Sequence, residues 1–247
     1  MTSGLYVYGV AARGLPAPPS GPAIDPERSP GVVEHGALAA IVSEVDVDEF
    51  EGDALERNAA APEWLESKVR AHHAVLEGTL ARTAVVPMRF GAIFSSESAL
   101  RGMLAANETE FERCLERVTG RSEWGLKVHA PEPRDLEEAA VAPRSGRDYL
   151  LQKKGRLDAR AGAAEAAAEL ARSVHAALSG VADEAVLVTS RTPAAVNAAY
   201  LVAHRARDTF MQRVDALQRV HGECTFEVTG PWPPYNFTSA DVTGPRS

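Results

Sequence analysis

The chain has 247 residues and a formal net charge of −8, with 45% hydrophobic and 24% charged residues. This composition excludes a disordered chain, and the length suits two domains of about 100 to 150 residues each. The acidic balance argues against nucleic acid as a partner, because a phosphate backbone would be repelled. No apolar run approaches the roughly 18 residues of a membrane-spanning helix, and MTSGLYVYGV has no leader-like pattern. We therefore expect a cytoplasmic protein with no membrane contact.

The N-terminal part of the sequence predicts two strands separated by a loop. LYVYGV at 5–10 is rich in aromatic and β-branched residues, which is typical of a strand. Six prolines between 14 and 31 remove amide donors and predict a loop. ALAAIVSEV at 37–45 predicts the second strand, and acidic, small residues then lead to Pro62.

A helix is predicted from Pro62 to about Ala81, because apolar residues recur at spacings of four and seven. Proline suits the first helical turn, where its missing donor would have no partner anyway. This apolar face consists of Leu65, Val69, Leu76 and Leu80. AVVPMRF at 84–90 predicts a strand directly after the helix.

A second amphipathic helix is predicted to begin at Ser95 as N-cap and to run to Val118, with Gly120 as its stop. Asn107 lies within this pattern. Beyond the glycine, apolar residues alternate with others, which predicts a half-buried strand. The alternating residues are Trp124, Leu126 and Val128.

The longest predicted helix runs from Arg147 to about Leu178. Its apolar residues recur every seven positions, at Leu150, Leu157, Ala164, Ala171 and Leu178. Gly155 and Gly162 weaken this helix by roughly 1 kcal/mol each relative to alanine. At ~1.5 Å per residue it reaches on the order of 45 Å, so we expect part of it to project or to lie between two domains.

The last part of the chain predicts a hairpin, a helix and a strand. EAVLVT at 184–189 and VNAAYLV at 196–202 predict two strands joined by the turn SRTPAA. A helix follows, with one face formed by Ala206, Phe210, Val214 and Leu217, and it ends at Gly222. The final strand has Cys224, Phe226 and Val228 in alternation.

Together these elements predict an α+β protein with two domains. From Trp124 onward the order is strand, helix, strand, strand, helix, strand, which is the ferredoxin-like or split βαβ arrangement. The earlier half has similar ingredients, with the proline-rich loop in place of its first crossover helix. We therefore predict a modified ferredoxin-like domain over 1–120 and a ferredoxin-like domain over 121–247, which includes the long helix and the proline/aromatic tail.

The sequence carries no motif for nucleotide-dependent or hydrolytic chemistry. It has neither a phosphate-binding glycine loop nor a G-x-S-x-G elbow, so we expect no catalytic residues, no cofactor and no enzyme activity. Adjacent His72 and His73 diverge by roughly 100° on a helix, which favours partly buried, hydrogen-bonded histidines over a metal site. Cys114 and Cys224 are far apart among apolar neighbours, as expected for free core thiols.

The segment GPWPPYNF at 230–237 stands out, because it combines three prolines with three aromatic residues. Proline lacks the ladder donor, so we expect this segment to be extended and stiff and not to continue the sheet. It is either a clasp that covers the sheet edge or the domain seam, or an ordered aromatic surface for a partner. We favour the clasp, because ring burial contributes ~2 kcal/mol each. The candidate residues are Trp232, Pro233, Pro234, Tyr235 and Phe237.

Two further candidates lie at the end of the predicted strand 84–90. Pro87 indicates an edge strand or a bulge. Arg89 points away from its neighbours Met88 and Phe90, so it is either a solvated edge charge or an ion-pair anchor between the domains.

Several of these segments resemble one family. VVPMRFGAIF at 85–94 is similar to the P-x-RFG-x-x-F block of the gas vesicle F/L proteins, and GPWPPYNF is similar to their C-terminal signature. The same order is kept by LYVYGV at 5–10, SGRDYLLQKK at 145–154 and NAAYLV at 197–202. The resemblance therefore spans nearly the whole chain, apart from the proline-rich loop.

The resemblance implies a non-enzymatic assembly factor with two domains of modified ferredoxin-like character. Such a protein is a minor vesicle component that binds the small, very apolar shell protein and limits its aggregation during nucleation. Its partners are the shell protein and other accessory proteins, and no catalytic residues carry over. Two alternatives are a ferredoxin-like domain that senses a small metabolite and regulates assembly, and a hydrolase without a recognisable motif.

Overall fold

The computed structural model describes residues 3–15, 22–50, 52–131, 145–189 and 194–238. Its contacts divide the chain into two compact units, one formed by Met1–Glu123 with Pro231–Ser247 and the other by Trp124–Gly230. The first division lies three residues beyond the predicted boundary at 120. The tail, which the sequence assigned to the second domain, groups with the first unit instead. The first unit is therefore built from two separate pieces of sequence.

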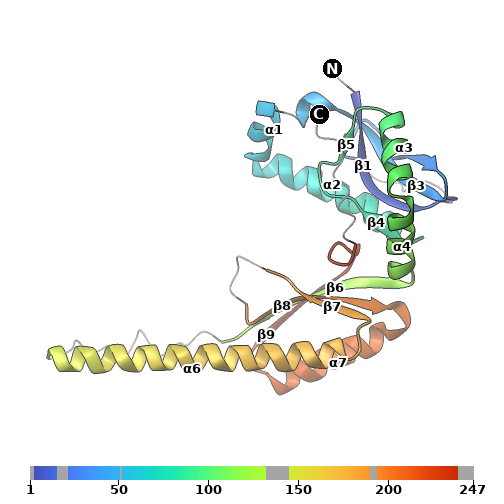
Figure 1. Ribbon diagram of the computed structural model, residues 1–247. Coiled ribbons are helices and arrows are strands. Elements are labelled where there is room, and N and C mark those ends of the chain that lie inside the picture. Colours follow the sequence, from blue (N-terminus) through green and yellow to red (C-terminus); the bar gives the residue numbers. More distant parts are fainter. Residues whose placement is uncertain (1–2, 16–21, 51, 132–144, 190–193, 239–247) are drawn as a thin grey trace. The chain divides into compact units, whose positions relative to one another are not determined.

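The first unit contains an antiparallel sheet in the strand order β2-β3-β1-β4, with β5 also paired to β1 (Figure 1). β1 pairs antiparallel with β3, from Ser3 opposite Asp46 to Ala12 opposite Leu38. The proline of β4 lies on an edge strand, as its missing amide donor requires. The strands are β1 Ser3–Ala12, β2 Gly31–His35, β3 Leu38–Asp46, β4 Val85–Pro87 and β5 Ile93–Phe94.

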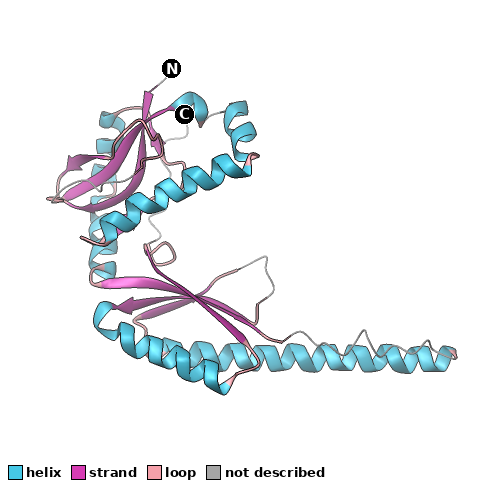
Figure 2. Ribbon diagram, turned by 180° about the vertical axis from the view of Figure 1, so that it is seen from behind, coloured by secondary structure: helices cyan, strands magenta, loops and turns pink. Residues whose placement is uncertain are grey.

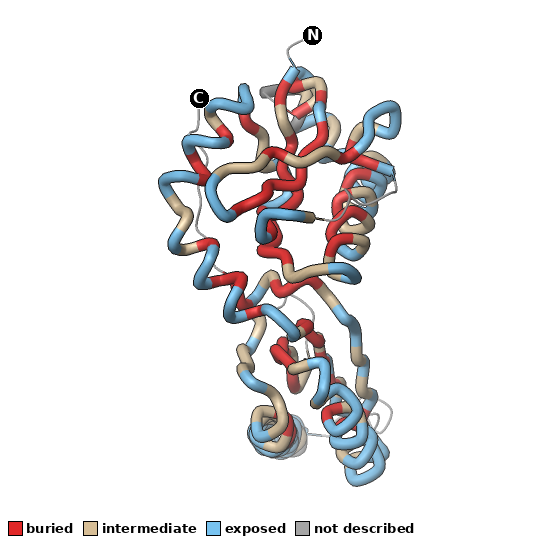
Figure 3. The backbone as a smooth tube through the Cα atoms, turned by 90° about the vertical axis from the view of Figure 1, so that its right-hand side faces the viewer, coloured by how far each residue is buried: buried red, intermediate tan, exposed pale blue. Residues whose placement is uncertain are grey.

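Helices cover both faces of this sheet (Figure 2). α3 and α4 pack on the face that contains Val7 and Val10, and α2 packs on the face that contains Tyr6 and Tyr8. Alternation along β1 supplies both cores, and the register shift between Val7 and Gly9 explains why Val10 shares the face of Val7. The helices are η1 Val47–Glu49, α1 Gly52–Ala59, α2 Pro62–Leu80, α3 Glu97–Ala106 and α4 Glu108–Val118. Figure 3 shows the resulting concentration of buried residues along these strands.

Two short elements of this unit, β2 and α1, differ from the prediction. β2 was not predicted: its first residue, Gly31, ends the predicted loop, and the next predicted strand begins only at 37. α1 was read as linker, because its sequence GDALERNA has few apolar residues to mark a helical face. The predicted strand 84–90 ends at Pro87, since the chain turns at Phe90 and Gly91. Gly91 has φ of +83°, a conformation that favours glycine.

The predicted second helix is two helices, α3 and α4, which meet at Asn107. The amide of Asn107 donates to the Met103 carbonyl at 2.8 Å, so its side chain competes with the helical backbone. The N-cap is Ser96 and not Ser95, because the Ser96 hydroxyl accepts from the Ala99 amide at 3.2 Å. Gly120 follows α4 with φ of +71°, which confirms the predicted stop.

The second unit contains an antiparallel sheet in the order β7-β8-β6-β9, with α6 and α7 on one face (Figure 2). The predicted strands, long helix and last helix are all present, although four residues of the predicted turn, 190–193, lie outside the described part of the chain. The elements are β6 Arg121–His129, α6 Gly146–Ser179, β7 Glu184–Leu187, β8 Val196–Ala203, η2 His204–Ala206, α7 Arg207–Val220 and β9 Thr225–Trp232. The division between the units falls inside β6 and inside β9.

α6 has 34 residues, but only its last part packs in the core of the second unit. Leu170, Val174 and Leu178 are at most 9% exposed and lie against the sheet. Leu150 and Leu157, also predicted to share this face, are 65% and 56% exposed. From 146 to 166 every described side chain except Gln152 is exposed, so this part of α6 extends beyond the sheet and no face of it is buried.

The structure therefore confirms a mixed α+β protein with two antiparallel sheets. Cys114 and Cys224 are buried free thiols, as predicted, and burial raises the pKa of both. Among the helices of the described residues, none combines the length and apolar character needed to cross a membrane.

Candidate functional site

The aromatic tail lies on α2 of the first unit. The His73 ring is 5.9 Å from the Trp232 ring and 5.6 Å from the Tyr235 ring, measured between centroids. Pro233 and Pro234 are buried and Phe237 is 4% exposed. Burial raises the pKa of the Tyr235 hydroxyl well above its usual range, so this phenol stays neutral.

The backbone of the tail differs from the predicted extended segment. β9 continues through Pro231 to Trp232, so the first proline does not end the strand. This proline is tolerated because β9 is an edge strand, where an amide donor is not needed on the outer side. The chain then turns, with the Tyr235 amide donating to the Pro233 carbonyl at 2.8 Å and the Phe237 amide to Pro234 at 3.1 Å.

Asn236 forms two hydrogen bonds from this turn to the buried carboxylate of Glu123. Its backbone amide donates to Glu123 Oε2 at 2.9 Å and its side-chain amide donates to Oε1 at 2.6 Å. Glu123 is 5% exposed, and burial raises its pKa against the opposing effect of these two hydrogen bonds. Both carboxylate oxygens therefore have a donor from the tail, which explains why the tail belongs to the first unit. The clasp role itself stays a prediction.

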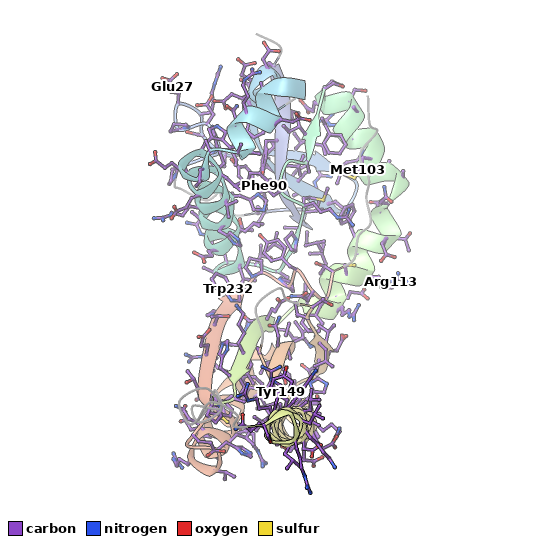
Figure 4. The ribbon with its side chains drawn as sticks, turned by 90° about the vertical axis from the view of Figure 1, so that its left-hand side faces the viewer. Glu27, Phe90, Met103, Arg113, Tyr149 and Trp232 are labelled. Atoms are coloured by element: carbon purple, nitrogen blue, oxygen red, sulfur yellow. The ribbon has the colours of Figure 1, made fainter. Side chains whose placement is uncertain are left out.

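A groove of about 580 Å³ lies between α2 and Trp232, which is labelled in Figure 4. Its apolar lining comes from Val69 and Ala74 together with the indole. Glu66 and Arg70 form an ion pair at its rim, and Glu77 is the second carboxylate there. This volume falls in the range of about 300 to 1,000 Å³ that is typical of ligand-binding clefts.

The buried face of α2 is not the predicted one. Leu65 is 37% exposed and Val69 lines the groove, whereas Lys68 and His72 are 9% and 2% exposed. Of the four predicted residues, Leu76 alone is fully buried. The apolar spacing did not predict which face of α2 is buried, because polar side chains on that face have hydrogen-bond partners. Tyr6 of the sheet is the partner of His72, and the Ile24 carbonyl of the preceding loop is a partner of Lys68.

His72 occupies the centre of an aromatic cluster. Its Nδ1 lies 2.9 Å from the Tyr6 hydroxyl, and its ring stacks on Tyr8 with 5.8 Å between centroids. Burial, followed by the neighbouring His73, lowers the pKa of His72 to about 4. His72 is therefore a neutral, buried histidine at physiological pH, the reading that the sequence favoured. Within the described residues, no group of three His, Cys, Asp or Glu side chains is placed to hold a metal ion.

Lys68 is a buried cation that the sequence analysis did not identify, because lysine normally marks a solvated face. Its Nζ donates to the Ile24 carbonyl and to Glu49 Oε2, both at 3.0 Å. The same nitrogen lies 5.7 Å from the centroids of the Phe50 and Trp64 rings. These contacts tie the loop before β2 and η1 to α2.

Arg89 and Phe90 lie at the turn that follows β4, with the Arg89 side chain exposed. Phe90 is 37% exposed, and its ring lies 6.2 Å from Tyr6 and 6.0 Å from His72. The structure thus brings Phe90, which is labelled in Figure 4, to the cluster of aromatic residues. A binding role for either residue stays a prediction.

Comparison with known proteins gives one consistent result. The family model described as "Gas vesicle synthesis protein GvpL/GvpF" matches residues 4–239. Gas vesicle protein L of Streptomyces sp. (strain CB03234) is 32% identical, over 94% of this chain and 91% of its own length. Gas vesicle protein F2 of Halobacterium salinarum is 29% identical, over 85% of this chain and 80% of its own length.

Solved structures show the same fold. The crystal structure of GvpF from Anabaena sp. PCC7120 has a TM-score of 0.71 at 18% identity, covering 96% of this chain and 98% of that chain. GvpF from Microcystis aeruginosa has a TM-score of 0.70 at 20% identity, with 96% and 99% covered.

Proposed function

Because the chain belongs to the gas vesicle synthesis protein GvpL/GvpF family, and so has a gas vesicle related role, we propose that it is a non-enzymatic assembly factor. In this proposal it binds the small, apolar shell protein and limits the aggregation of that protein during nucleation. It acts in the cytoplasm together with other accessory proteins and stays with the vesicle as a minor component.

The groove between α2 and Trp232 is the observation that best supports shell-protein binding. Its apolar lining of Val69, Ala74 and indole suits an apolar side chain of an unpolymerised subunit. The charged rim formed by Glu66, Arg70 and Glu77 keeps the empty groove compatible with water. An apolar lining surrounded by a polar rim is the usual construction of a reversible binding surface.

Co-expression with the shell protein tests this proposal. Val69→Glu places a carboxylate in the groove beside Glu66 and Glu77, and we expect it to reduce co-purified shell protein by roughly tenfold. Val220→Glu is the matched control, because Val220 is 73% exposed on α7. Shell protein that stays insoluble with the unmodified chain contradicts the function, whereas equal capture by both variants contradicts only the groove.

Asn236→Ala separates the two interpretations of the tail. It removes the side-chain hydrogen bond to Glu123 Oε1, keeps the backbone hydrogen bond to Oε2, and changes no residue that lines the groove. A clasp predicts that this variant loses stability, by about 1 to 3 kcal/mol because the buried Oε1 atom loses its donor, and still captures shell protein. Loss of capture at unchanged stability would instead assign the turn to the binding surface.

We also propose that each half is ferredoxin-like, the first in modified form. Within each unit the sheet has its second, third, first and fourth strands side by side in that order, if β5 is set aside. In the second unit α6 and α7 connect the strands where a split βαβ fold has its helices. In the first unit α2 occupies the later crossover, and the described residues 13–15 and 22–30 of the earlier one contain no helix.

A further inference from the structure

The first part of α6 is a helix without tertiary packing among the described residues. From Gly146 to Ala166 every described side chain is exposed except that of Gln152, which is half-buried. Tyr149 and Leu151 are 54% and 60% exposed. Figure 4 looks along this helix and shows its side chains projecting on all sides near Tyr149. At ~1.5 Å per residue this part is about 30 Å long.

One face of this part carries cations and apolar residues together. Tyr149, Lys153, Arg156 and Arg160 follow one another at spacings of four, three and four, which places them on one side of the helix. They line a hollow of about 260 Å³ together with Gln152 and Leu157. We call this surface, defined by Tyr149, Lys153, Arg156, Leu157 and Arg160, the cationic face.

The charges of the cationic face are not neutralised within the described residues. Neither Lys153, Arg156 nor Arg160 has an acidic residue three or four positions away on α6. Four arginines on other helices or later on α6 pair with such a carboxylate, and these pairs are Arg70–Glu66, Arg101–Glu97, Arg113–Glu110 and Arg172–Glu169. Like charges at these spacings destabilise a helix by roughly 0.2 to 0.5 kcal/mol per pair. An external acidic group would remove this repulsion.

A second copy of the chain does not fit the cationic face. Continuing the same side of α6 toward its end reaches Ala163 and Ala167, so this side has no carboxylate between 149 and 167. Parallel or antiparallel pairing of two copies would therefore place cations against cations or against alanine. A nucleic acid fits less well than a protein, because the chain has a net charge of −8 and phosphates would leave Leu157 uncovered.

We propose that the cationic face binds an acidic amphipathic helix of a partner protein. Carboxylates spaced by three and four residues on that helix would pair with Lys153, Arg156 and Arg160. Its apolar side chains would cover Tyr149 and Leu157, which water now surrounds. This surface lies in the second unit, so it is separate from the groove on α2, and it extends the proposed function by a second partner site.

Fluorescence anisotropy of the full chain tests the proposal with a designed helical peptide. The peptide carries Glu at alternating spacings of three and four and Leu on the adjacent face, and a scrambled peptide has the same composition. The triple variant Lys153→Glu, Arg156→Glu, Arg160→Glu should bind the designed peptide at least about tenfold more weakly. Lys127→Glu, Arg213→Glu, Arg219→Glu is the matched control, because it makes the same charge change at exposed positions of the second unit. We expect this control to stay within about twofold of the unmodified chain.

Leu157→Ser tests the apolar part of the face. It should weaken binding of the designed peptide and leave the weak binding of the scrambled peptide unchanged. Circular dichroism checks that every variant keeps its helix content. Equal binding of the two peptides, or equal loss in the two triple variants, would overturn the proposal, because either result means charge attraction without a site.

Competing occupants give distinct results. A single-stranded oligonucleotide and phosphatidylglycerol vesicles are tested in the same way. If either binds the unmodified chain more tightly than the peptide does, and binds the triple variant of the cationic face more weakly, the partner is a nucleic acid or a membrane and the proposal of a protein partner is wrong. The chain itself has acidic residues at Asp135, Glu137 and Glu138. If the peptide binds only after these are changed to Asn, Gln and Gln, the chain's own segment competes for the face, and the proposal fails.

Discussion

The long helices α2 and α6 differ in which side chains they bury: α2 buries polar ones and α6 exposes apolar ones. α2 places Lys68 and His72, which are 9% and 2% exposed, against the sheet of the first unit. α6 leaves Leu150 and Leu157 65% and 56% exposed. A helix therefore buries the residues that face a neighbouring element, whether or not those residues are the most apolar ones in its sequence.

Polar burial on α2 depends on specific partners. The Tyr6 hydroxyl faces His72, and the Ile24 carbonyl, Glu49 and two aromatic rings surround the Lys68 ammonium. On α6, the exposed leucines face no described element and remain in contact with water. The contrast is thus between a face of α2 whose polar groups have partners within the first unit and a part of α6 whose apolar side chains are exposed.

The largest difference between the helices should appear when one leucine is shortened on each. Leu76→Ala on α2 empties a fully buried site and should lower the free energy of unfolding by about 2 to 5 kcal/mol. Leu157→Ala on α6 removes an exposed side chain and should change it by no more than about 0.5 kcal/mol. Urea unfolding followed by circular dichroism measures both. Similar losses would show that the first part of α6 is packed in solution.

A pH-dependent difference should be associated with His72 of α2. Its folded pKa of about 4 lies below the value near 6.5 of an unfolded chain, so the unfolded state binds the proton first. The stabilisation is complete above about pH 6.5 and is lost as pH falls toward 4, by up to about 3 kcal/mol.

Comparing urea unfolding of the unmodified chain and of His72→Gln at several pH values isolates this contribution. The glutamine oxygen can still accept from Tyr6, and Glu123, whose pKa burial raises, titrates in both proteins and cancels. We expect a shallower loss of stability between pH 6.5 and 4 in the variant. An unchanged slope would mean that His72 is solvated in the native state.

The smallest effect should come from the backbone of the exposed part of α6. Gly155→Ala should stabilise this helix by about 1 kcal/mol, because a methyl group added there meets no atom within 4 Å. Slower hydrogen exchange of amides in 146–166 would record the gain. Gly9→Ala in β1 is the contrasting case, because its methyl group would lie 2.9 Å from the Val86 carbonyl oxygen. Faster exchange in the α6 variant would contradict an unpacked helix.

Element order was largely predictable, because it depends on local pattern. Alternation identified β6 and β9, and the helical spacing identified α2, α6 and α7 near their observed ends. β2 and α1 were missed because five residues after a proline-rich loop, and a helix with few apolar residues, have little periodicity. Asn107 ends α3 through a hydrogen bond of its own side chain, which no count of apolar positions reveals.

The candidate site was predictable only in part. The tail was identified by its composition, and Phe90 by its place in the P-x-RFG-x-x-F block. Val69 was assigned to the buried face of α2 although it lines the groove, and the burial of Lys68 was not predicted, because spacing gives a helical face only relative to other residues of the same helix. Which side meets the sheet depends on β1 and on the loop at Ile24, both distant in sequence.

The sequence alone determined the family, the α+β class and the order of most elements, because these depend on motifs and on patterns a few residues long. Only the tertiary structure decided that the tail belongs to the first unit, since this depends on Glu123 meeting Asn236 more than a hundred positions away. It also decided that Lys68 is buried while Leu157 is exposed. Burial is a property of what lies opposite a side chain, and hydropathy records only the side chain itself.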